Sequence, residues 1–273
     1  MKIINLVEDT KGGDCLNEHG LSFYVETKKH RLLVDSGATD MFVRNAEMLG
    51  VDLAKVDTFI LSHGHYDHSG GLTAFAKIAP DAKIYLKDSA GGEHYHLMPE
   101  FEKYIGIDKR IMELPQVVKV SGNMQIDNEL FLFSDINGKL YPEWSNRELV
   151  KKVGDKFIRD DFVHEQCLVI FQGERRILMS GCAHNGILSI LNKYSELFGA
   201  YPDTVISGFH MMKKTDHTDE ETEYIKQTAR ELMKTKALFY TGHCTGQRAF
   251  EIMKEVMGEQ LRGFHSGSVL DAE

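Results

Sequence analysis

The stretch Leu61-Ser62-His63-Gly64-His65-Tyr66-Asp67-His68-Ser69-Gly70-Gly71-Leu72 places three histidines and one aspartate within six positions. It follows an apolar run that predicts a strand and precedes a glycine-rich helix start. Alternate residues of an extended chain point the same way, so His63 and His65 can hold one metal ion. Asp67 and His68, past the bend, can turn toward a second. Burying these groups without a ligand would be costly, so the pattern favours a metal site.

Three later histidines stand in a matching context, each after an apolar strand and small residues. They are His184 after Ser180-Gly181-Cys182-Ala183, His210 after Ser207-Gly208-Phe209, and His243 after Thr241-Gly242. In a layered α/β fold, strand ends at one edge converge. The repeated context therefore predicts that these histidines meet the first cluster, whereas each one alone would fit a structural role equally well.

Strands and helices are predicted to alternate over residues 1–90 and again from residue 165. A helix is expected from a Thr39 cap to Gly50, and another opens at the glycines before Leu72. Near the end of the chain, Thr218-Asp219-Glu220-Glu221 forms a capping box that predicts a helix start. This alternation is typical of the α/β class.

Residues 91–163 lack a long hydrophobic period, with short strands expected near 117–120, 129–133 and 157–158. We interpret the region as an insertion in a single domain over 1–273, covering or edging a site. Its aromatic residues Phe101, Tyr104 and Trp144 are candidates for a lid or a contact in a homodimer.

Composition excludes several classes of protein. The chain has 273 residues, with 32 Lys+Arg against 41 Asp+Glu and a net charge of −9. This acidic balance argues against a general nucleic-acid binder. No apolar run approaches the roughly 20 residues of a membrane helix, and the first residues lack a signal-peptide pattern, so a cytoplasmic location is expected. The four cysteines are interpreted as reduced thiols.

The motif HxHxDH, formed by His63, His65, Asp67 and His68, resembles the signature of the metallo-β-lactamase superfamily. The resemblance covers nearly the whole chain outside 91–163. It implies a four-layer αββα sandwich, an α/β (α+β) fold with an inserted lobe, and a site for two divalent ions at one edge. Zinc is favoured, with manganese or iron as alternatives. The implied ligands are His63, His65 and His184 for the first metal, and Asp67, His68 and His243 for the second.

The chain departs from the family pattern at one point. Most members place a bridging aspartate after the fourth motif strand, but no carboxylate directly follows Ser207-Gly208-Phe209. His210 near that place is either itself a ligand or a group that faces substrate. Cys182 is a third candidate, because a thiolate binds zinc well; the alternative is a small buried thiol.

A narrower resemblance rests on the segments Glu18-His19-Gly20-Leu21-Ser22, LLVDSG, SGCAHNG and GHCTG. They are similar to a subgroup often named 7,8-dihydropterin-6-methyl-4-(β-D-ribofuranosyl)-aminobenzene 5′-phosphate synthase. That name denotes the joining of a dihydropterin diphosphate to a ribosyl-aminobenzene phosphate. Glu18 and His19 are candidate substrate-binding groups, and an exposed polar turn is the alternative.

These observations predict a metal-dependent hydrolase that acts on a phosphoester or related ester of a small molecule. Two cations lower the pKa of a bound water, Asp67 would orient that water, and His210 would donate a hydrogen bond to an anionic oxygen. The transferase named above is one alternative. A non-catalytic, metal-holding regulatory protein is another. No nucleic acid or membrane partner is expected.

Overall fold

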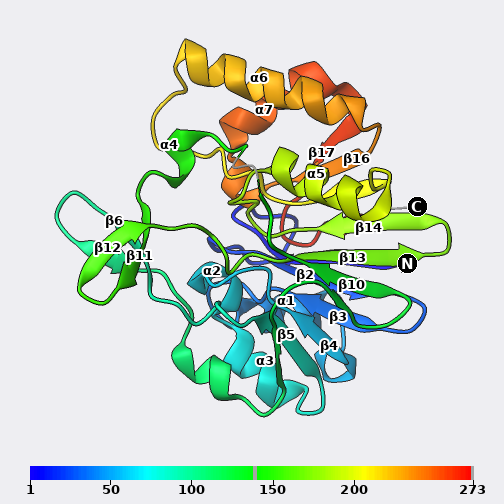
Figure 1. Cartoon of the computed structure of the whole chain (residues 1–273). Coiled ribbons are helices and arrows are strands. Elements are labelled where there is room, and N and C mark those ends of the chain that lie inside the picture. The colour runs from blue at the N-terminus through cyan, green and yellow to red at the C-terminus, as the bar shows by residue number, and fades with distance from the viewer. Residues whose placement is uncertain (138–139, 272–273) are drawn as a thin grey trace.

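The computed structural model describes residues 1–137 and 140–271, and its core is a pair of seven-stranded sheets packed face to face (Figure 1). Residues 138 and 139 of the predicted insertion lie outside the described residues. The first sheet has the order β18-β1-β2-β3-β4-β5-β8. Its strands are β1 (Lys2–Val7), β2 (Ser22–Glu26), β3 (Arg31–Val34), β4 (Thr58–Ile60), β5 (Lys83–Lys87), β8 (Val117–Val120) and β18 (Val269–Leu270).

The second sheet has the order β17-β16-β15-β14-β13-β10-β9. Its strands are β9 (Met124–Gln125), β10 (Leu130–Phe133), β13 (Cys167–Gln172), β14 (Arg175–Met179), β15 (Thr204–Ile206), β16 (Leu238–Thr241) and β17 (Leu261–Gly263). Within each sheet one block of neighbours is parallel: β3, β4, β5 and β8 in the first, and β14 to β17 in the second. Parallel neighbours place their carboxyl ends at the same edge of the sheet.

Helices cover the outer face of each sheet, which completes the four layers (Figure 1). On the first sheet lie α1 (Met41–Met48) and α3 (Leu72–Ile78), together with the short 3₁₀ turn η1 (Leu53–Lys55). On the second lie α5 (Ile187–Phe198), α6 (Asp219–Lys234) and α7 (Gln247–Met257), the last followed by η4 (Gly258–Gln260). The four-layer sandwich that the resemblance implied is therefore confirmed.

The strand sequences explain why the layers form. In β13, Val169 packs on the helix side while Leu168 and Ile170 pack between the sheets, because successive side chains of a strand point to opposite faces. The same alternation divides Phe59 from Ile60 in β4. Strands buried on both faces need apolar residues at every position, which is the continuous pattern seen in the sequence.

One helix start differs in detail from the sequence prediction, and two agree with it. Asp40, not Thr39, is the residue before α1, and its side chain makes no capping hydrogen bond. The helix expected after the glycines is α3, and the structure adds a short helix before them, α2 (Tyr66–Ser69). The capping box of Thr218 and Glu221 is present as predicted, with both reciprocal hydrogen bonds.

The stretch predicted as one insertion over 91–163 is divided by the structure. Its middle part joins the sandwich, because β8 extends the first sheet and β9 and β10 extend the second. The remainder forms a separate four-stranded sheet of order β12-β11-β6-β7, which we call the lobe, and the linking turns. The remaining elements are β6 (His94–Leu97), β7 (Glu102–Tyr104), η2 (Lys109–Glu113), α4 (Glu143–Asn146), β11 (Leu149–Val153) and β12 (Lys156–Arg159).

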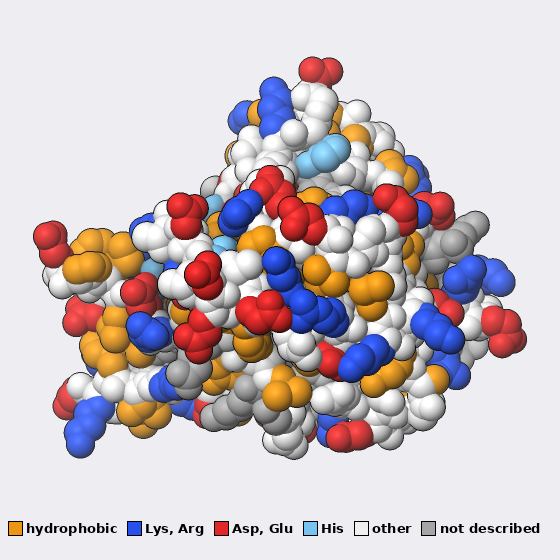
Figure 2. All heavy atoms as spheres, turned by 90° about the horizontal axis from the view of Figure 1, so that it is seen from above, with side chains coloured by type: hydrophobic (Ala, Val, Ile, Leu, Met, Phe, Trp, Pro, Cys, Tyr) orange, Lys and Arg blue, Asp and Glu red, His pale blue; other side chains and the backbone are white. Residues whose placement is uncertain are grey.

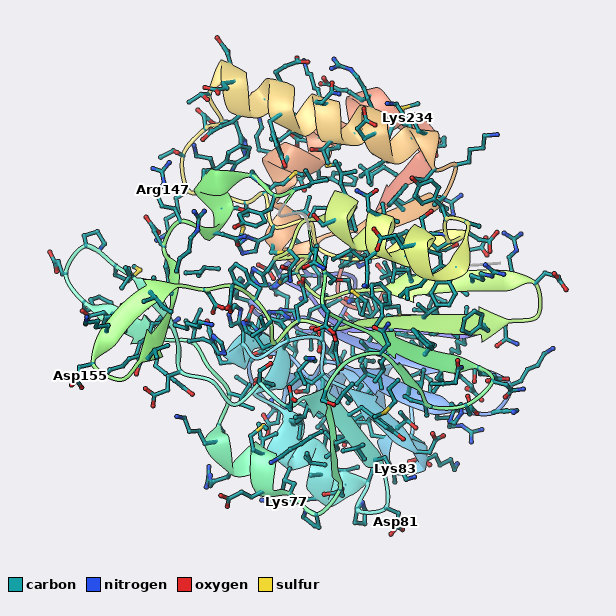
Figure 3. The ribbon with its side chains drawn as sticks, viewed as in Figure 1. Lys77, Asp81, Lys83, Arg147, Asp155 and Lys234 are labelled. Atoms are coloured by element: carbon teal, nitrogen blue, oxygen red, sulfur yellow. The ribbon has the colours of Figure 1, made fainter. Side chains whose placement is uncertain are left out.

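The lobe projects from one side of the sandwich, with Asp155 at its far tip and Arg147 where it meets α4 (Figure 3). Apolar side chains gather on this end of the surface (Figure 2). Phe101 is 57% exposed and Tyr104 39%. Trp144 instead packs edge-on against Tyr224 of α6, with ring centroids 5.4 Å apart, so it joins α4 to the body of the molecule. No helix within 1–137 or 140–271 combines the length and apolar character needed to cross a bilayer.

Candidate metal centre

The histidines singled out in the sequence follow the carboxyl ends of the parallel strands, at the edge where both sheets meet the lobe (Figure 1). His63 follows β4, His184 follows β14, and His243 follows β16 in a 3₁₀ turn, η3 (His243–Thr245). Gly70 lets the chain that follows these ligands pack directly against the backbone of Ala38, because a Cβ at Gly70 would lie 1.9 Å from the Ala38 carbonyl oxygen. Only glycine fits at such a contact.

The first donor group consists of His63, His65 and His184, all buried. His63 Nε2 lies 3.1 Å from His65 Nδ1 and 3.3 Å from His184 Nε2. In His63 and His184, the ring nitrogen that points away from the group lies next to a side-chain oxygen, and this determines which nitrogen is free to bind a metal. Ser62 Oγ bonds to His63 Nδ1 at 2.9 Å, and Asn146 Oδ1 lies 3.3 Å from His184 Nδ1. These partners take the Nδ1 protons and leave both Nε2 lone pairs facing inward.

The second donor group consists of Asp67, His68 and His243. Asp67 Oδ2 lies 3.5 Å from His68 Nε2 and 3.4 Å from His243 Nε2. Each imidazole donates its Nδ1 proton to a buried or half-buried carboxylate: His68 to Asp35 Oδ2 at 2.7 Å, and His243 to Asp9 Oδ1 at 2.6 Å. A carboxylate behind a histidine ligand fixes its tautomer and raises its basicity.

Both groups fit a small divalent cation. With metal–nitrogen distances of about 2.0–2.1 Å in tetrahedral geometry, ligand atoms lie about 3.3 Å apart, which is the spacing found in each group. Lone pairs that face one another in a buried space repel unless a cation or a proton lies between them. His63 thus lies close to His65 and His184, and Asp67 lies close to His68 and His243; that these six residues are the metal ligands stays a prediction.

The two groups differ in charge. Burial, reinforced by neighbouring imidazoles, lowers the pKa of His63, His65 and His184 well below the usual value, so these rings are neutral. Burial acts the same way on His243, but its hydrogen bonds to Asp67 and Asp9 outweigh it and raise the pKa well above the usual value. The carboxylates that favour a proton there also favour a metal cation in its place.

Asp67 keeps its negative charge in this setting. Burial raises the pKa of the Asp67 carboxyl, but the charges of His68 and His243 outweigh burial and lower it below the usual range. An ionised carboxylate is the form that binds a metal. The second donor group thus contains a carboxylate anion, whereas the first consists of neutral imidazoles alone.

Cys182 lies between the two groups. Its buried Sγ is 3.2 Å from His68 Nε2. The thiol also completes two sets of donor atoms within 4.8 Å of one another, one with His63 and His184 and one with His68 and His243. Cys182 therefore lies within reach of both donor groups, and burial raises the pKa of its thiol well above the usual value.

His210 lies beside the first donor group but belongs to none of the donor sets within 1–137 and 140–271. Its ring centroid is 4.2 Å from that of His184, and its buried Nδ1 has no hydrogen-bond partner there. The residue adopts a positive φ of 48°, a strained conformation for a side chain with a Cβ. Burial lowers the pKa of His210 to about 3, so the ring is a neutral donor or acceptor.

Glu18 and His19 occupy different places. The Glu18 carboxylate accepts hydrogen bonds from the backbone N–H groups of Ala38 and Thr39, both at 3.0 Å, and from Thr39 Oγ1 at 2.8 Å. His19 is half-exposed, with Nδ1 2.8 Å from Asp9 and Nε2 3.6 Å from Asp67. His19 therefore lies at the rim of the second donor group, while Glu18 holds the turn before α1.

Sequence reasoning missed the residues that orient the ligands. Asp35 had a usable signal, since it ends the β3 strand as the histidines end theirs. Asp9 and Asn146 had none, because they bond to histidines 234 and 38 positions away.

A family model described as the metallo-beta-lactamase superfamily matches residues 17–243. The chain belongs to the metallo-β-lactamase superfamily. The predicted fold and family are therefore both confirmed.

Two relatives from Methanocaldococcus jannaschii align over nearly their whole length. The chain is 27% identical to 7,8-dihydropterin-6-methyl-4-(beta-D-ribofuranosyl)-aminobenzene-5'-phosphate synthase, covering 99% of this chain and 96% of the relative. It is 26% identical to an uncharacterized protein, covering 97% and 96%. The crystal structure of Tm1679, a metal-dependent hydrolase of the β-lactamase superfamily, has a TM-score of 0.82 at 29% identity and covers 99% of this chain and 98% of its own.

Proposed function

We propose that this protein is a metal-dependent hydrolase that cleaves a phosphoester or related ester of a small molecule. The observation that carries the proposal is the pair of adjoining donor groups, each with its lone pairs turned inward by its outer partners. Zinc is favoured by the imidazole-rich set, with manganese or iron as alternatives because of Asp67. When bound, two cations lower the pKa of a water toward neutrality and offset charge on the substrate oxygens.

The protein groups around that chemistry have separate tasks. Asp67 would accept a hydrogen bond from the attacking water and hold its orientation, since its carboxylate is ionised. His210, neutral and with a free ring nitrogen, would donate a hydrogen bond to the anionic oxygen of the substrate. Cys182 would be a further ligand if a bound cation displaces the proton that burial holds on its thiol.

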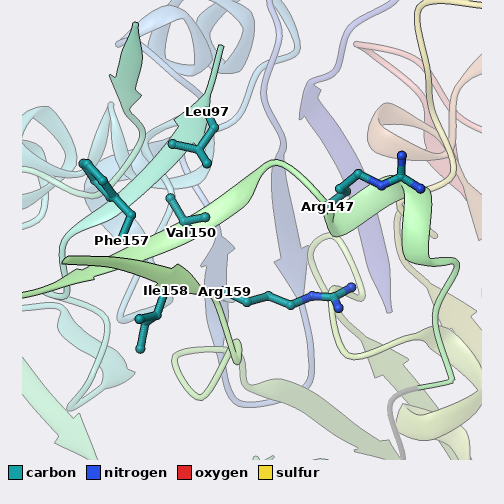
Figure 4. Close-up of a pocket in the computed structure, with 6 residues that line it drawn as sticks. All are labelled: Leu97, Arg147, Val150, Phe157, Ile158 and Arg159. Carbon is teal, nitrogen blue, oxygen red and sulfur yellow. The ribbon is translucent and has the colours of Figure 1, made fainter. Parts of the chain in front are cut away.

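We propose that the phosphate of the substrate binds in a cavity of about 300 Å³ in the lobe. It is lined by Leu97, Arg147, Val150, Phe157, Ile158 and Arg159. Its two guanidinium groups lie toward one side and the apolar side chains toward the other (Figure 4). Arg147 follows Asn146, whose side chain donates to the His184 carbonyl at 2.8 Å. Arginine pairs recognise phosphate and the apolar wall suits a ring, so an aromatic phosphate would fit both features.

The test is a substrate panel on protein purified without chelators, with His65→Ala as the inactive control. Release of inorganic phosphate or alcohol from one phosphoester, without a second substrate, would support the hydrolase. Metal-loaded protein that is inert on phosphoesters, thioesters and lactams would contradict it and favour a metal-holding regulatory role.

The transferase is the second candidate, favoured by the whole-length likeness to the methanogen synthase. In this reaction a dihydropterin diphosphate would lose inorganic diphosphate as the ribosyl-aminobenzene phosphate attacks the pterin methylene. Release of diphosphate that requires the arylamine phosphate would support the transferase against the hydrolase. The same two arginines would then hold the acceptor's phosphate.

A further inference from the structure

A second cluster of buried ionisable groups lies behind His65, on the side away from His63. It consists of His65 itself, His94 of β6, Asp160 directly after β12, and His164. One ligand-type atom from each lies within 4.8 Å of the others, and all four residues are buried. His94 and Asp160 belong to the lobe region, so the cluster joins that region to the metal centre.

The hydrogen bonds determine where the protons lie. Asp160 Oδ2 accepts from His94 Nδ1 at 2.6 Å, and Asp160 Oδ1 accepts from the Phe162 N–H at 2.9 Å. His164 Nδ1 accepts from the Gly64 N–H at 2.9 Å, so the proton of this neutral ring is on Nε2. That nitrogen lies 3.5 Å from Asp160 Oδ2. Both histidines therefore present an N–H to the same carboxylate.

His65 presents a third N–H to this cluster. Its Nδ1 faces His63, so the neutral ring carries its proton on Nε2. Within 1–137 and 140–271, that buried Nε2 has no hydrogen-bond partner. An unpartnered buried N–H is destabilising, and binding a cation at Nδ1 makes the ring more positive. The Asp160 carboxylate is the group in this cluster that can stabilise both.

The other ligand imidazoles show what His65 lacks. His63, His68, His184 and His243 each have a side-chain oxygen on the nitrogen that points away from the donor group. For His63, His68 and His243 that oxygen belongs to the N-terminal part of the chain, and for His184 it belongs to Asn146. Among these five histidines, His65 is the one whose outward nitrogen has no hydrogen-bond partner in the described part of the chain, and the Asp160 carboxylate lies within 4.8 Å of its ring donor atom.

We infer that Asp160, held by His94 and His164, is a positioning residue for His65, and that the lobe region thereby strengthens the first metal site. This inference rests on the proposed metal centre. Its physical content is that the carboxylate fixes the His65 tautomer and balances the charge that the ring acquires on binding a cation. The second metal site does not depend on it, because its outer partners are Asp9 and Asp35.

The same four residues are poorly prepared to bind a metal themselves. A histidine that binds through Nε2 must carry its proton on Nδ1, but His164 Nδ1 is already accepting from Gly64. His94 is the exception, because its Nδ1 proton is donated to Asp160 and its Nε2 is left without a proton. His65, in turn, directs its Nδ1 lone pair toward His63 and away from the cluster. A third metal ion would have to break one of these bonds, so the proton positions favour a supporting role over a metal site.

The experiment measures Zn²⁺ affinity, by competition with a chromophoric chelator, in two backgrounds that each keep one donor group. His243→Ala keeps the first group, and His184→Ala keeps the second. Asp160→Asn is introduced into each background. The matched control is Asp161→Asn, which removes the neighbouring, exposed carboxylate that pairs with Lys151. Thermal unfolding of the metal-free proteins checks folding, and His94→Asn is a milder variant for the case that Asp160→Asn does not fold.

Asp160→Asn is expected to weaken Zn²⁺ binding by about 10- to 100-fold in the first background, and to leave the second within twofold. His94→Asn should act in the same direction by less, and Asp161→Asn should change neither. Unchanged affinity in the first background would overturn the inference while leaving the metal centre intact. A third equivalent of Zn²⁺ in the wild-type protein, lost in Asp160→Asn, would overturn it by making the cluster a metal site. A wild-type protein that binds no Zn²⁺ would refute the proposed function as well.

Discussion

The two halves of the metal centre are built from different chemistry. The first donor group has three neutral imidazoles, and two of its outer partners, Asn146 and Asp160, come from the region between the sandwich strands. The second has a carboxylate and two imidazoles, backed by Asp9 and Asp35 of the sandwich. The sandwich thus supplies negative charge to the second donor group. The region that contains the lobe supplies the side chains that orient the imidazoles of the first donor group. A site built in this way should lose its two metals separately.

Removing one ligand from each half gives the largest expected effect. His184→Ala and His243→Ala should each retain one metal equivalent and each lose about 100-fold or more in activity, since a lost ligand costs more than the 10–100-fold attached to an outer partner. Metal analysis beside steady-state rates checks this, with the exposed His265→Ala as control. Loss of both metals in either variant would mean that the halves are not independent.

Asp9→Asn sharpens the comparison from the second half. His243 would lose the carboxylate that accepts its Nδ1 proton, so the affinity of the second group should fall by about 10- to 100-fold while the first is unchanged. Zn²⁺ competition in the His184→Ala and His243→Ala backgrounds separates the two affinities. An equal loss in both would show that Asp9 acts on the whole edge rather than on one half.

Acidification should strip the second metal first. The pKa of His243 is raised, so a proton competes with the cation at any pH below that raised value, and affinity falls about tenfold per pH unit there. The pKa values of His63, His65 and His184 are lowered, so these rings stay free of protons further into the acid range. Equilibrium dialysis from about pH 8 to about pH 6 measures the occupancy of both metal sites. Loss of the first metal at a higher pH than the second would contradict the conclusion that His243, rather than the first three histidines, holds a proton.

Glu18→Ala gives the smallest effect and separates a structural role from contact with substrate. The carboxylate bonds two backbone N–H groups and a hydroxyl, so its loss should lower the free energy of unfolding by about 1–3 kcal/mol. Urea denaturation measures this change, with the exposed Glu196→Ala as reference. A raised KM at unchanged stability would instead assign Glu18 to the substrate.

How much of the centre could be predicted depends on where the information lies along the chain. Four of the residues lie within six positions of the sequence: His63, His65, Asp67 and His68. Their spacing therefore predicts a metal site without knowledge of the fold. His184 and His243 needed the repeated strand-end context, which parallel strands convert into proximity. Cys182 could be named as a candidate but not placed between the two groups, because that depends on how two sheets meet.

Two of the residues that orient the histidines, Asp9 and Asp160, could not be predicted from the sequence, and the reason is physical. Asp9 and Asp160 are single acids among many, and nothing near them in the sequence marks a histidine partner. The sequence did not predict how residues 91–163 are divided between the sandwich and the lobe, because short strands such as β8 and β10 carry the same pattern whether they join a large sheet or a small one.

The most direct measurement is the metal content of the crystallised protein, located by anomalous scattering at the metal absorption edge. We expect two adjacent peaks, one among His63, His65 and His184 and the other among Asp67, His68 and His243. One peak alone, a peak behind His65, or no peak at all in fully active protein would contradict a catalytic centre of two cations.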